Sequence, residues 1–240
     1  MASILAIDTS SAWCSVALSL HGHEPIFRHQ AVTAGASQLL LPWIEEVLAE
    51  AKLDLSLLDA IAVGIGPGAF TGVRLGVAAV QGLAISHDIP VIPVASIDAI
   101  AAQVVQTPSF KEHCPRYFVV AIDARMDEIY WSKYELLQEG LPIRLGNIHL
   151  SKPEDIDLND IDYLAGSAVN EFGERLFQGK DLSLEMIPID AGISVSALGV
   201  LDCAMRLYQE NRCCDVRELE PLYIRNKVAL TTAERLEAFK

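Results

Sequence analysis

The chain has 240 residues, 51% of them hydrophobic and 21% charged, and its 18 Lys and Arg stand against 32 Asp and Glu, a formal net charge of −14. That length suffices for one large domain or two small lobes, and the composition is typical of a globular protein. Proteins that bind nucleic acid alone neutralise phosphates with clustered Lys and Arg, so the acidic balance argues against direct nucleic-acid binding.

The sequence also limits where the protein works. Its first residues carry no basic segment and reach an acidic residue, Asp8, too soon for a secretion signal, and no uncharged apolar run is long enough to span a membrane. Its five cysteines are odd in number and include no Cys-x-x-Cys pair. We therefore expect a cytoplasmic protein with reduced thiols and no membrane partner.

The first half alternates apolar runs with turn and helix signals. An acidic, hydroxyl-rich turn separates two apolar runs between Ile4 and Leu20, which predicts a strand, a tight turn and a second strand. The following elements are expected to be a strand at 26–30, a helix from an N-cap at Ser37 to Ala51, a strand at 59–65, a loop at 66–72, a helix to about Ser86, a strand at 90–94 and a helix capped by Ser96.

The same plan restarts at Tyr117. Residues 117–134 again predict strand, acidic turn and strand, and Ala-Ile-Asp recurs at Ala121–Asp123 as at Ala6–Asp8. Further elements are expected as a strand at 143–150, a short helix at 153–157, a strand at 162–165, a glycine-bearing loop into a helix at 166–173, a strand at 184–189 and a long helix at 196–210.

This repetition predicts a duplicated α/β fold with two lobes. An acidic residue in the first hairpin of each half is typical of the actin/Hsp70/sugar-kinase (ASKHA, ribonuclease H-like) architecture, in which paired hairpins face a nucleotide cleft. Asp also suits tight turns for purely local reasons, so Asp8 and Asp123 alone leave that alternative open. We expect an N-terminal lobe at 1–105, completed by part of the C-terminal segment, a C-terminal lobe at 106–220 and a tail at 221–240.

The glycine loop at 66–72 is the most informative stretch. Its three glycines allow positive φ and close backbone approach, and the following helix N-terminus could offer N–H groups to a phosphate. It lacks the Gly-Lys-Ser/Thr of a P-loop, and a sharp turn that brings elements together explains the glycines equally well. We expect a vestigial nucleotide cleft, whose candidate residues are Asp8, Thr9, Ser10, Gly66, Gly68, Thr71, Gly72 and Asp123.

Two helices carry more apolar residues than one core stripe needs. Apolar side chains fall on nearly every face of the helix at 71–86, and the helix at 37–51 has extra ones. These helices could be buried deep within the chain or could dock on a second chain. The candidate interface residues are Leu39, Leu40, Trp43, Val47, Val73, Val77 and Val80.

Four segments together resemble the TsaB (YeaZ) family. They are 6–10 (Ala-Ile-Asp-Thr-Ser), 66–76 (Gly-Pro-Gly-Ala-Phe-Thr-Gly-Val-Arg-Leu-Gly), 121–130 (Ala-Ile-Asp-Ala-Arg-Met-Asp-Glu-Ile-Tyr) and 220–225 (Glu-Pro-Leu-Tyr-Ile-Arg). The resemblance implies a subunit needed to form N6-threonylcarbamoyladenosine at position 37 of tRNAs that read ANN codons. It also implies a catalytic paralogue, the TsaD-like transferase, as partner, a TsaE-like ATPase, and a homodimer when the partner is missing.

Metal ligands that the paralogue would carry are missing here. TsaD-like chains place two histidines at i and i+4 after the glycine-loop helix, whereas Ser96 and Ile100 stand at those positions in this chain. We therefore expect no metal site, no catalytic residue and no cofactor required by this chain, with ATP or ADP only in the complex. Two alternatives are a phosphotransferase using Asp8 and Asp123 around magnesium and ATP, and a protein resembling M22-type peptidases.

Overall fold

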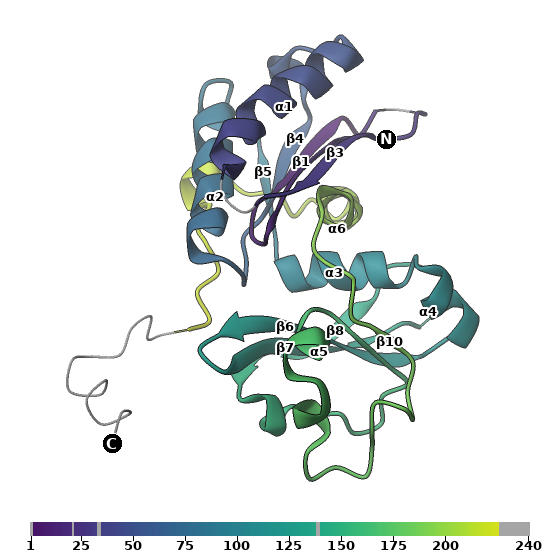
Figure 1. Ribbon diagram of the computed structural model, residues 1–240. Coiled ribbons are helices and arrows are strands. Elements are labelled where there is room, and N and C mark those ends of the chain that lie inside the picture. The colour runs from purple at the N-terminus through teal and green to yellow at the C-terminus, as the bar shows by residue number, and fades with distance from the viewer. Residues whose placement is uncertain (1, 21, 33–34, 138–139, 226–240) are drawn as a thin grey trace, which may run out of the picture.

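The structure is a computed structural model that describes residues 2–20, 22–32, 35–137 and 140–225. Two five-stranded sheets lie one above the other, with helices between them and on their outer sides (Figure 1). Within the described residues, none of the helices has the length and apolar character that crossing a membrane requires.

The N-terminal sheet has the order β3-β2-β1-β4-β5. Its strands are β1 (Ile4–Asp8), β2 (Trp13–Leu18), β3 (Ile26–Ala31), β4 (Ala60–Gly64) and β5 (Val91–Val94). β1 pairs antiparallel with β2 and parallel with β4, so the hairpin turn after β1 and the loop after β4 both start at the carboxyl ends of neighbouring strands. This arrangement brings the Asp8 turn and the glycine loop together.

The C-terminal sheet repeats this plan in the order β8-β7-β6-β9-β10. Its strands are β6 (Tyr117–Arg125), β7 (Glu128–Glu135), β8 (Ile143–Ser151), β9 (Tyr163–Ala165) and β10 (Ile189–Asp190). Here too the first strand is antiparallel to the second and parallel to the fourth. The matching topology confirms the duplicated two-lobed ASKHA-like fold.

Two long helices cover the outer face of the N-terminal sheet: α1 (Ala36–Ala51) and α2 (Phe70–Ile85) (Figure 1). Their buried side chains join those of the sheet in one apolar cluster, and the short 3-10 turn η1 (Leu55–Leu57) follows α1. The predicted N-cap at Ser37 is wrong, because α1 is preceded by Gly35 at φ 106 and Ser37 is already inside the helix.

Between the two sheets lie α3 (Ser96–Val104) and α6 (Ala197–Gln209) (Figure 1). One apolar cluster joins them to the inner faces of both sheets, with Ala6 and Ile92 from one lobe and Phe118 and Tyr163 from the other. The chain therefore returns from the C-terminal sheet to the N-terminal sheet at α6. α6 packs on β1 and β4, and the division into lobes at 1–105 and 106–220 stays a prediction.

The outer face of the C-terminal sheet is covered by short elements. They are α5 (Ala168–Phe172) and the 3-10 turns η2 (Pro153–Asp155) and η3 (Gly173–Phe177), while α4 (Pro108–His113) follows α3. The predicted helix at 153–157 is thus only a 3-10 turn. The predicted strand at 184–189 is reduced to β10, because Leu184 and Ile187 pack on the cluster from a loop.

After α6 the chain returns to the N-terminal lobe. The backbone of Cys214 forms an isolated antiparallel β-bridge with Val91 on β5. The 3-10 turn η4 (Val216–Glu218) contacts α2, and the Leu222 amide donates a hydrogen bond to the Ile65 carbonyl at 2.8 Å. That a C-terminal segment completes the first lobe as a domain stays a prediction. Of the tail predicted at 221–240, residues 226–240 lie outside the described part of the chain.

Candidate functional site

The end of β1 and the first half of the hairpin turn that follows it are buried in their own lobe. Asp8 has no exposed surface, and Thr9 and Ser10 are 2% exposed. One carboxylate oxygen of Asp8 accepts the Ser10 amide at 2.9 Å, and the Ser10 hydroxyl donates to the same carboxylate at 3.0 Å. The turn is therefore ordered by its own side chain, as short Asx turns are.

The glycine loop packs directly on this turn. The Ala69 amide donates to the Ser10 carbonyl at 2.6 Å, and the Thr9 hydroxyl donates to the Gly72 carbonyl at 2.7 Å. A Cβ atom at Gly68 or Gly72 would overlap the carbonyl oxygens of Ser10 and Thr9. These glycines are thus required for close approach of two backbone segments within the chain.

The first amide of the loop is also engaged within the chain. The Gly66 amide donates to the Ser96 hydroxyl at 3.1 Å, and Gly66 itself has φ 95, a conformation that favours glycine. Beside it, a Cβ at Gly64 would overlap the Asp8 carboxylate. The loop therefore cradles the hairpin turn, and this supports the structural interpretation of its glycines over a phosphate cradle.

Burial dominates the electrostatics of Asp8. Removal from water raises the pKa of the Asp8 carboxyl from 3.8 to about 6, although hydrogen bonds from Ser10 and Ser96 oppose the rise. A carboxyl with no exposed surface has no open side for a solvated cation. Its surroundings suit a structural role better than magnesium binding.

Asp123, the counterpart of Asp8, lies in a different setting. Its carboxylate accepts the Arg125 amide at 2.7 Å and pairs with the Arg125 guanidinium at 3.0 Å. Its amide donates to the Ser167 hydroxyl at 3.1 Å. The structure thus gathers Asp8, Thr9, Ser10, Gly66, Gly68 and Gly72 into one contact network, leaves Thr71 exposed at the start of α2, and gives Asp123 polar contacts within the C-terminal lobe.

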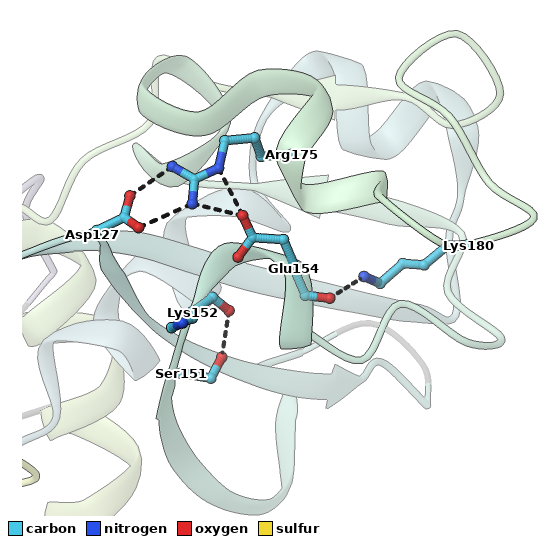
Figure 2. A network of polar contacts seen from close by, with 6 residues as sticks. All are labelled: Asp127, Ser151, Lys152, Glu154, Arg175 and Lys180. Atoms are coloured by element: carbon cyan, nitrogen blue, oxygen red, sulfur yellow. Dashed lines mark hydrogen bonds and ion pairs between the residues drawn. The ribbon is translucent and has the colours of Figure 1, made fainter.

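An ion-pair network on the C-terminal lobe was missed by sequence reasoning. Arg175 contacts Asp127 at 2.6 Å and Glu154 at 2.6 Å, and Lys180 donates to the Glu154 carbonyl at 2.6 Å (Figure 2). These residues come from the hairpin turn, η2, and η3 and the loop that follows it. Their spacing along the chain gives no signal, because the contacts form only after the lobe has folded.

Arg225 also had no predicted role, although its motif contributed to the family resemblance. Its guanidinium donates to the Ala124 carbonyl at 2.9 Å and pairs with Glu128 at 2.8 Å, and its side chain is only 12% exposed. Together with the bond from Leu222 to Ile65, this makes residues 222–225 a strap between the two lobes.

The predicted docking residues require a correction. Leu40, Val47, Val73, Val77 and Val80 are at most 6% exposed and belong to the apolar cluster under α1 and α2. They cannot form a surface for a second chain in this fold, because they face the sheet of their own lobe. Leu39 and Trp43 are half-buried at its edge, and the large apolar side chains that are exposed on the two helices are Leu41, Phe70 and Ile85.

The positions at which a TsaD-like chain would carry histidines are inside the core. Ser96 is 1% exposed and Ile100 is 2% exposed, and the Ser96 hydroxyl is directed to Gly66 and Asp8. In the described part of the chain, no three His, Cys, Asp or Glu side chains are grouped so that they could hold a metal ion.

The fold and the closed hairpin site define a class: two-lobed ASKHA-like proteins in which the N-terminal hairpin is packed under its glycine loop. The model of the family described as "TsaD: tRNA N6-adenosine threonylcarbamoyltransferase" matches residues 32–230. The tRNA threonylcarbamoyladenosine biosynthesis proteins TsaB of Haemophilus influenzae and Escherichia coli are 34% and 30% identical to the chain. Each alignment covers 94% of this chain, and 94% and 96% of those proteins respectively.

A solved structure agrees with these relatives. YeaZ from Pseudomonas aeruginosa matches with a TM-score of 0.81 at 33% identity, over 93% of this chain and 100% of that one. The chain belongs to the TsaB (YeaZ) family.

Proposed function

We propose that this chain is a non-catalytic subunit in the formation of N6-threonylcarbamoyladenosine at position 37 of tRNAs that read codons beginning with A. The names of the H. influenzae and E. coli relatives support the pathway. The observation that carries the non-catalytic role is the closed hairpin turn, in which Asp8 is fully buried beneath Gly64 and the glycine loop. A carboxylate enclosed in this way cannot position a metal-bound nucleotide.

The catalytic step would belong to a partner. In this proposal a TsaD-like paralogue carries the transferase site, a TsaE-like ATPase joins the pair, and any ATP or ADP belongs to the complex. The chain itself requires no cofactor, works in the cytoplasm and meets tRNA only through its partners, since its net charge of −14 disfavours direct contact with phosphates.

Docking would use the outward faces of α1 and α2. Leu41, Phe70 and Ile85 are between 49% and 56% exposed there. Burial of such side chains against a second chain stabilises a complex. Because the partner is a paralogue with related helices, the same face could pair with a second copy of this chain when the partner is missing.

Charge substitutions on this face test the docking. We expect Leu41→Glu and Ile85→Glu to abolish co-purification with the organism's TsaD-like protein and to stop threonylcarbamoyladenosine formation in a reconstituted reaction. The matched control is Met186→Glu, an exposed apolar residue on the C-terminal lobe that is 66% exposed. Leu40→Glu and Val77→Glu are unsuitable, because each would place a charge in the core. Normal co-purification by both exposed variants would refute the assigned face.

A second measurement addresses catalysis itself. Asp8→Asn, once shown to be folded, is expected to support modification by the complex at the wild-type rate. Loss of turnover with intact complex formation would contradict the non-catalytic role and leave the docking face unaffected.

A further inference from the structure

A concave site lies between the lobes, away from the closed hairpin turn. It is a pocket of about 390 Å³ at the end of β5, bounded by α3, α6, the start of β8 and the returning C-terminal segment. Its apolar walls include Pro93, Leu141, Leu207 and Leu222. Pockets of a few hundred Å³ with apolar walls and a few converging polar groups are the usual form of small-molecule sites.

The pocket is on the opposite side of α3 from the closed hairpin site. Ser96 directs its hydroxyl to Gly66 and Asp8, whereas Asp98 lies two residues further along the same helix. Two residues correspond to a rotation of about 200° around a helix axis. Asp98 accordingly reaches the other lobe, where it accepts a hydrogen bond from the Tyr134 hydroxyl at 2.7 Å.

Three arginines from three separate segments line this pocket. They are Arg144 on β8, Arg206 on α6 and Arg212 in the segment after α6. A concentration of positive charge is unexpected in a chain with 18 basic and 32 acidic residues. Because guanidinium groups match the geometry of phosphate and carboxylate oxygens, their convergence on one cavity indicates an anion as ligand.

Only one of these arginines is fully engaged within the chain. Arg144 contacts both oxygens of Asp98 at 3.2 Å. Arg212 has a longer contact, 3.6 Å to Glu210, and its side chain is 67% exposed. Arg206 has no carboxylate oxygen within 4.0 Å among the described residues. The three arginines therefore outnumber the two carboxylates, Asp98 and Glu210, that contact them.

The polar side of the pocket is built without a nucleophile. Burial raises the pKa of Asp98, with Arg144, Tyr134 and Arg206 opposing the rise, and burial raises the pKa of the Cys203 thiol to about 12. The thiol is thus protonated and unreactive at neutral pH. These groups suit binding rather than covalent chemistry.

We propose that this pocket is a binding site for a small phosphate monoester with an apolar body, in which Arg206 and Arg212 hold the phosphate and the walls formed by Leu141, Leu207 and Leu222 hold the body. A phosphate monoester carries about −1.5 to −2 charges at neutral pH, and it would replace the long Glu210 contact as the anionic partner of Arg212. A ligand in this pocket would contact elements of both lobes, so its binding would favour one arrangement of α6 relative to β8.

Phenyl phosphate is a suitable probe, because it has a dianionic head and a compact apolar body. In calorimetric titration of the full chain at neutral pH and low salt, we expect saturable binding with a Kd of about 0.1–1 mM. Phenol, which keeps the ring and lacks the phosphate, is expected to show no saturable binding. Absence of phenyl phosphate binding up to about 10 mM, or equal binding of phenol, would overturn the proposal.

Variants locate the binding. Arg206→Gln and Arg212→Gln are each expected to weaken phenyl phosphate binding by about tenfold. The control is Arg217→Gln, which removes the same charge from an exposed arginine that does not line the pocket and is paired with Asp215 at 2.9 Å. Equal weakening by the control would show diffuse attraction and refute the site. The test does not depend on how Arg206→Gln folds, because Arg212 is largely exposed and its replacement leaves the fold intact.

Discussion

The two hairpin turns of the molecule share the Ala-Ile-Asp sequence, the same place in their sheets and a hydrogen bond from the amide two residues further on to the Asp carboxylate, yet their surroundings differ. The N-terminal turn at Asp8 is buried beneath the glycine loop. The C-terminal turn has Arg125, Met126 and Asp127 at φ between 58° and 62°, all three exposed, and is held by charged side chains. The strand order of the two sheets is identical, so topology does not explain the contrast.

The difference lies in the segment that covers each turn. Gly64, Gly68 and Gly72 let β4 and α2 approach the Asp8 turn without a Cβ between them. Among the described residues of the other lobe, Gly166 is the one glycine that approaches the turn-bearing strand in this way, at the Ala121 carbonyl, and Asp123 pairs with Arg125. A duplicated motif thus keeps its backbone geometry, while its neighbours decide whether it is enclosed.

The largest expected loss of stability comes from disrupting the close contact between Gly72 and the N-terminal turn. Gly72→Ala should lower the free energy of unfolding by about 3 kcal/mol or more, because its Cβ would overlap the Thr9 carbonyl. Gly82→Ala in the same helix meets nothing within 4 Å and should raise it by up to about 1 kcal/mol. Urea unfolding measures both, and equal effects would show that the close approach does not matter.

A loss of stability of similar size is expected when the buried carboxyl of Asp8 ionises. Its pKa is about 6 in the folded state and 3.8 in the unfolded chain, so the folded state binds more protons between these values. Its contribution to stability is complete below about pH 4 and decreases by about 3 kcal/mol as the pH rises through 6. Asp8→Asn should remove this part of the pH dependence of unfolding. An unchanged difference between pH 4 and pH 7 would contradict the burial of the charge.

The C-terminal turn should respond more weakly, through Arg225. Arg225→Gln removes the pair with Glu128 and bonds to the Ala124 and Arg125 carbonyls, and should lower the free energy of unfolding by about 1–3 kcal/mol. The exposed pair of Arg217 with Asp215 offers a matched control, for which little change is expected. Equal losses of stability in the two variants would show that the strap between the lobes contributes no more than an exposed ion pair.

The smallest effect is expected from the exposed network in Figure 2. Arg175→Gln removes contacts to Asp127 and Glu154, yet these side chains are between 27% and 60% exposed. Such pairs are weak and are screened by salt, so the shift in unfolding midpoint should be below that of Arg225→Gln and should shrink further in 1 M salt. If the shift in unfolding midpoint stayed the same in high salt, the network would stabilise the C-terminal turn more than the exposure of its side chains indicates.

The sequence was sufficient for the repeated strands and the long helices, because their apolar periodicity and the Ala-Ile-Asp repeat are local signals. It failed where packing decides. Residues 184–188 are apolar enough for a strand but pack as a loop, and Ser37 and Ser96 suit N-caps but are not used as such. Gly35 precedes α1, and the Ser96 hydroxyl instead accepts the Gly66 amide.

The candidate site shows the same limit. Spacing placed Asp8 beside the glycine loop, but it could not tell whether the glycines admit a ligand or another segment of the chain. Periodicity also identified α1 and α2 as unusually apolar, yet five of the seven chosen side chains face the core. Which apolar side of a helix is covered depends on the neighbouring helix and sheet, and a single sequence does not contain that choice.

The position of α6 has a consequence for synthesis on the ribosome. The inner face of the first sheet, begun at Ile4, is covered by a helix that starts at Ala197. At about 5–20 residues per second, the growing chain must wait about 10–40 s before that cover exists. During this interval the apolar side chains of β1 and β4 are exposed to other nascent chains. Chaperone association should therefore be strongest on nascent chains that stop short of α6 and should fall once it has emerged.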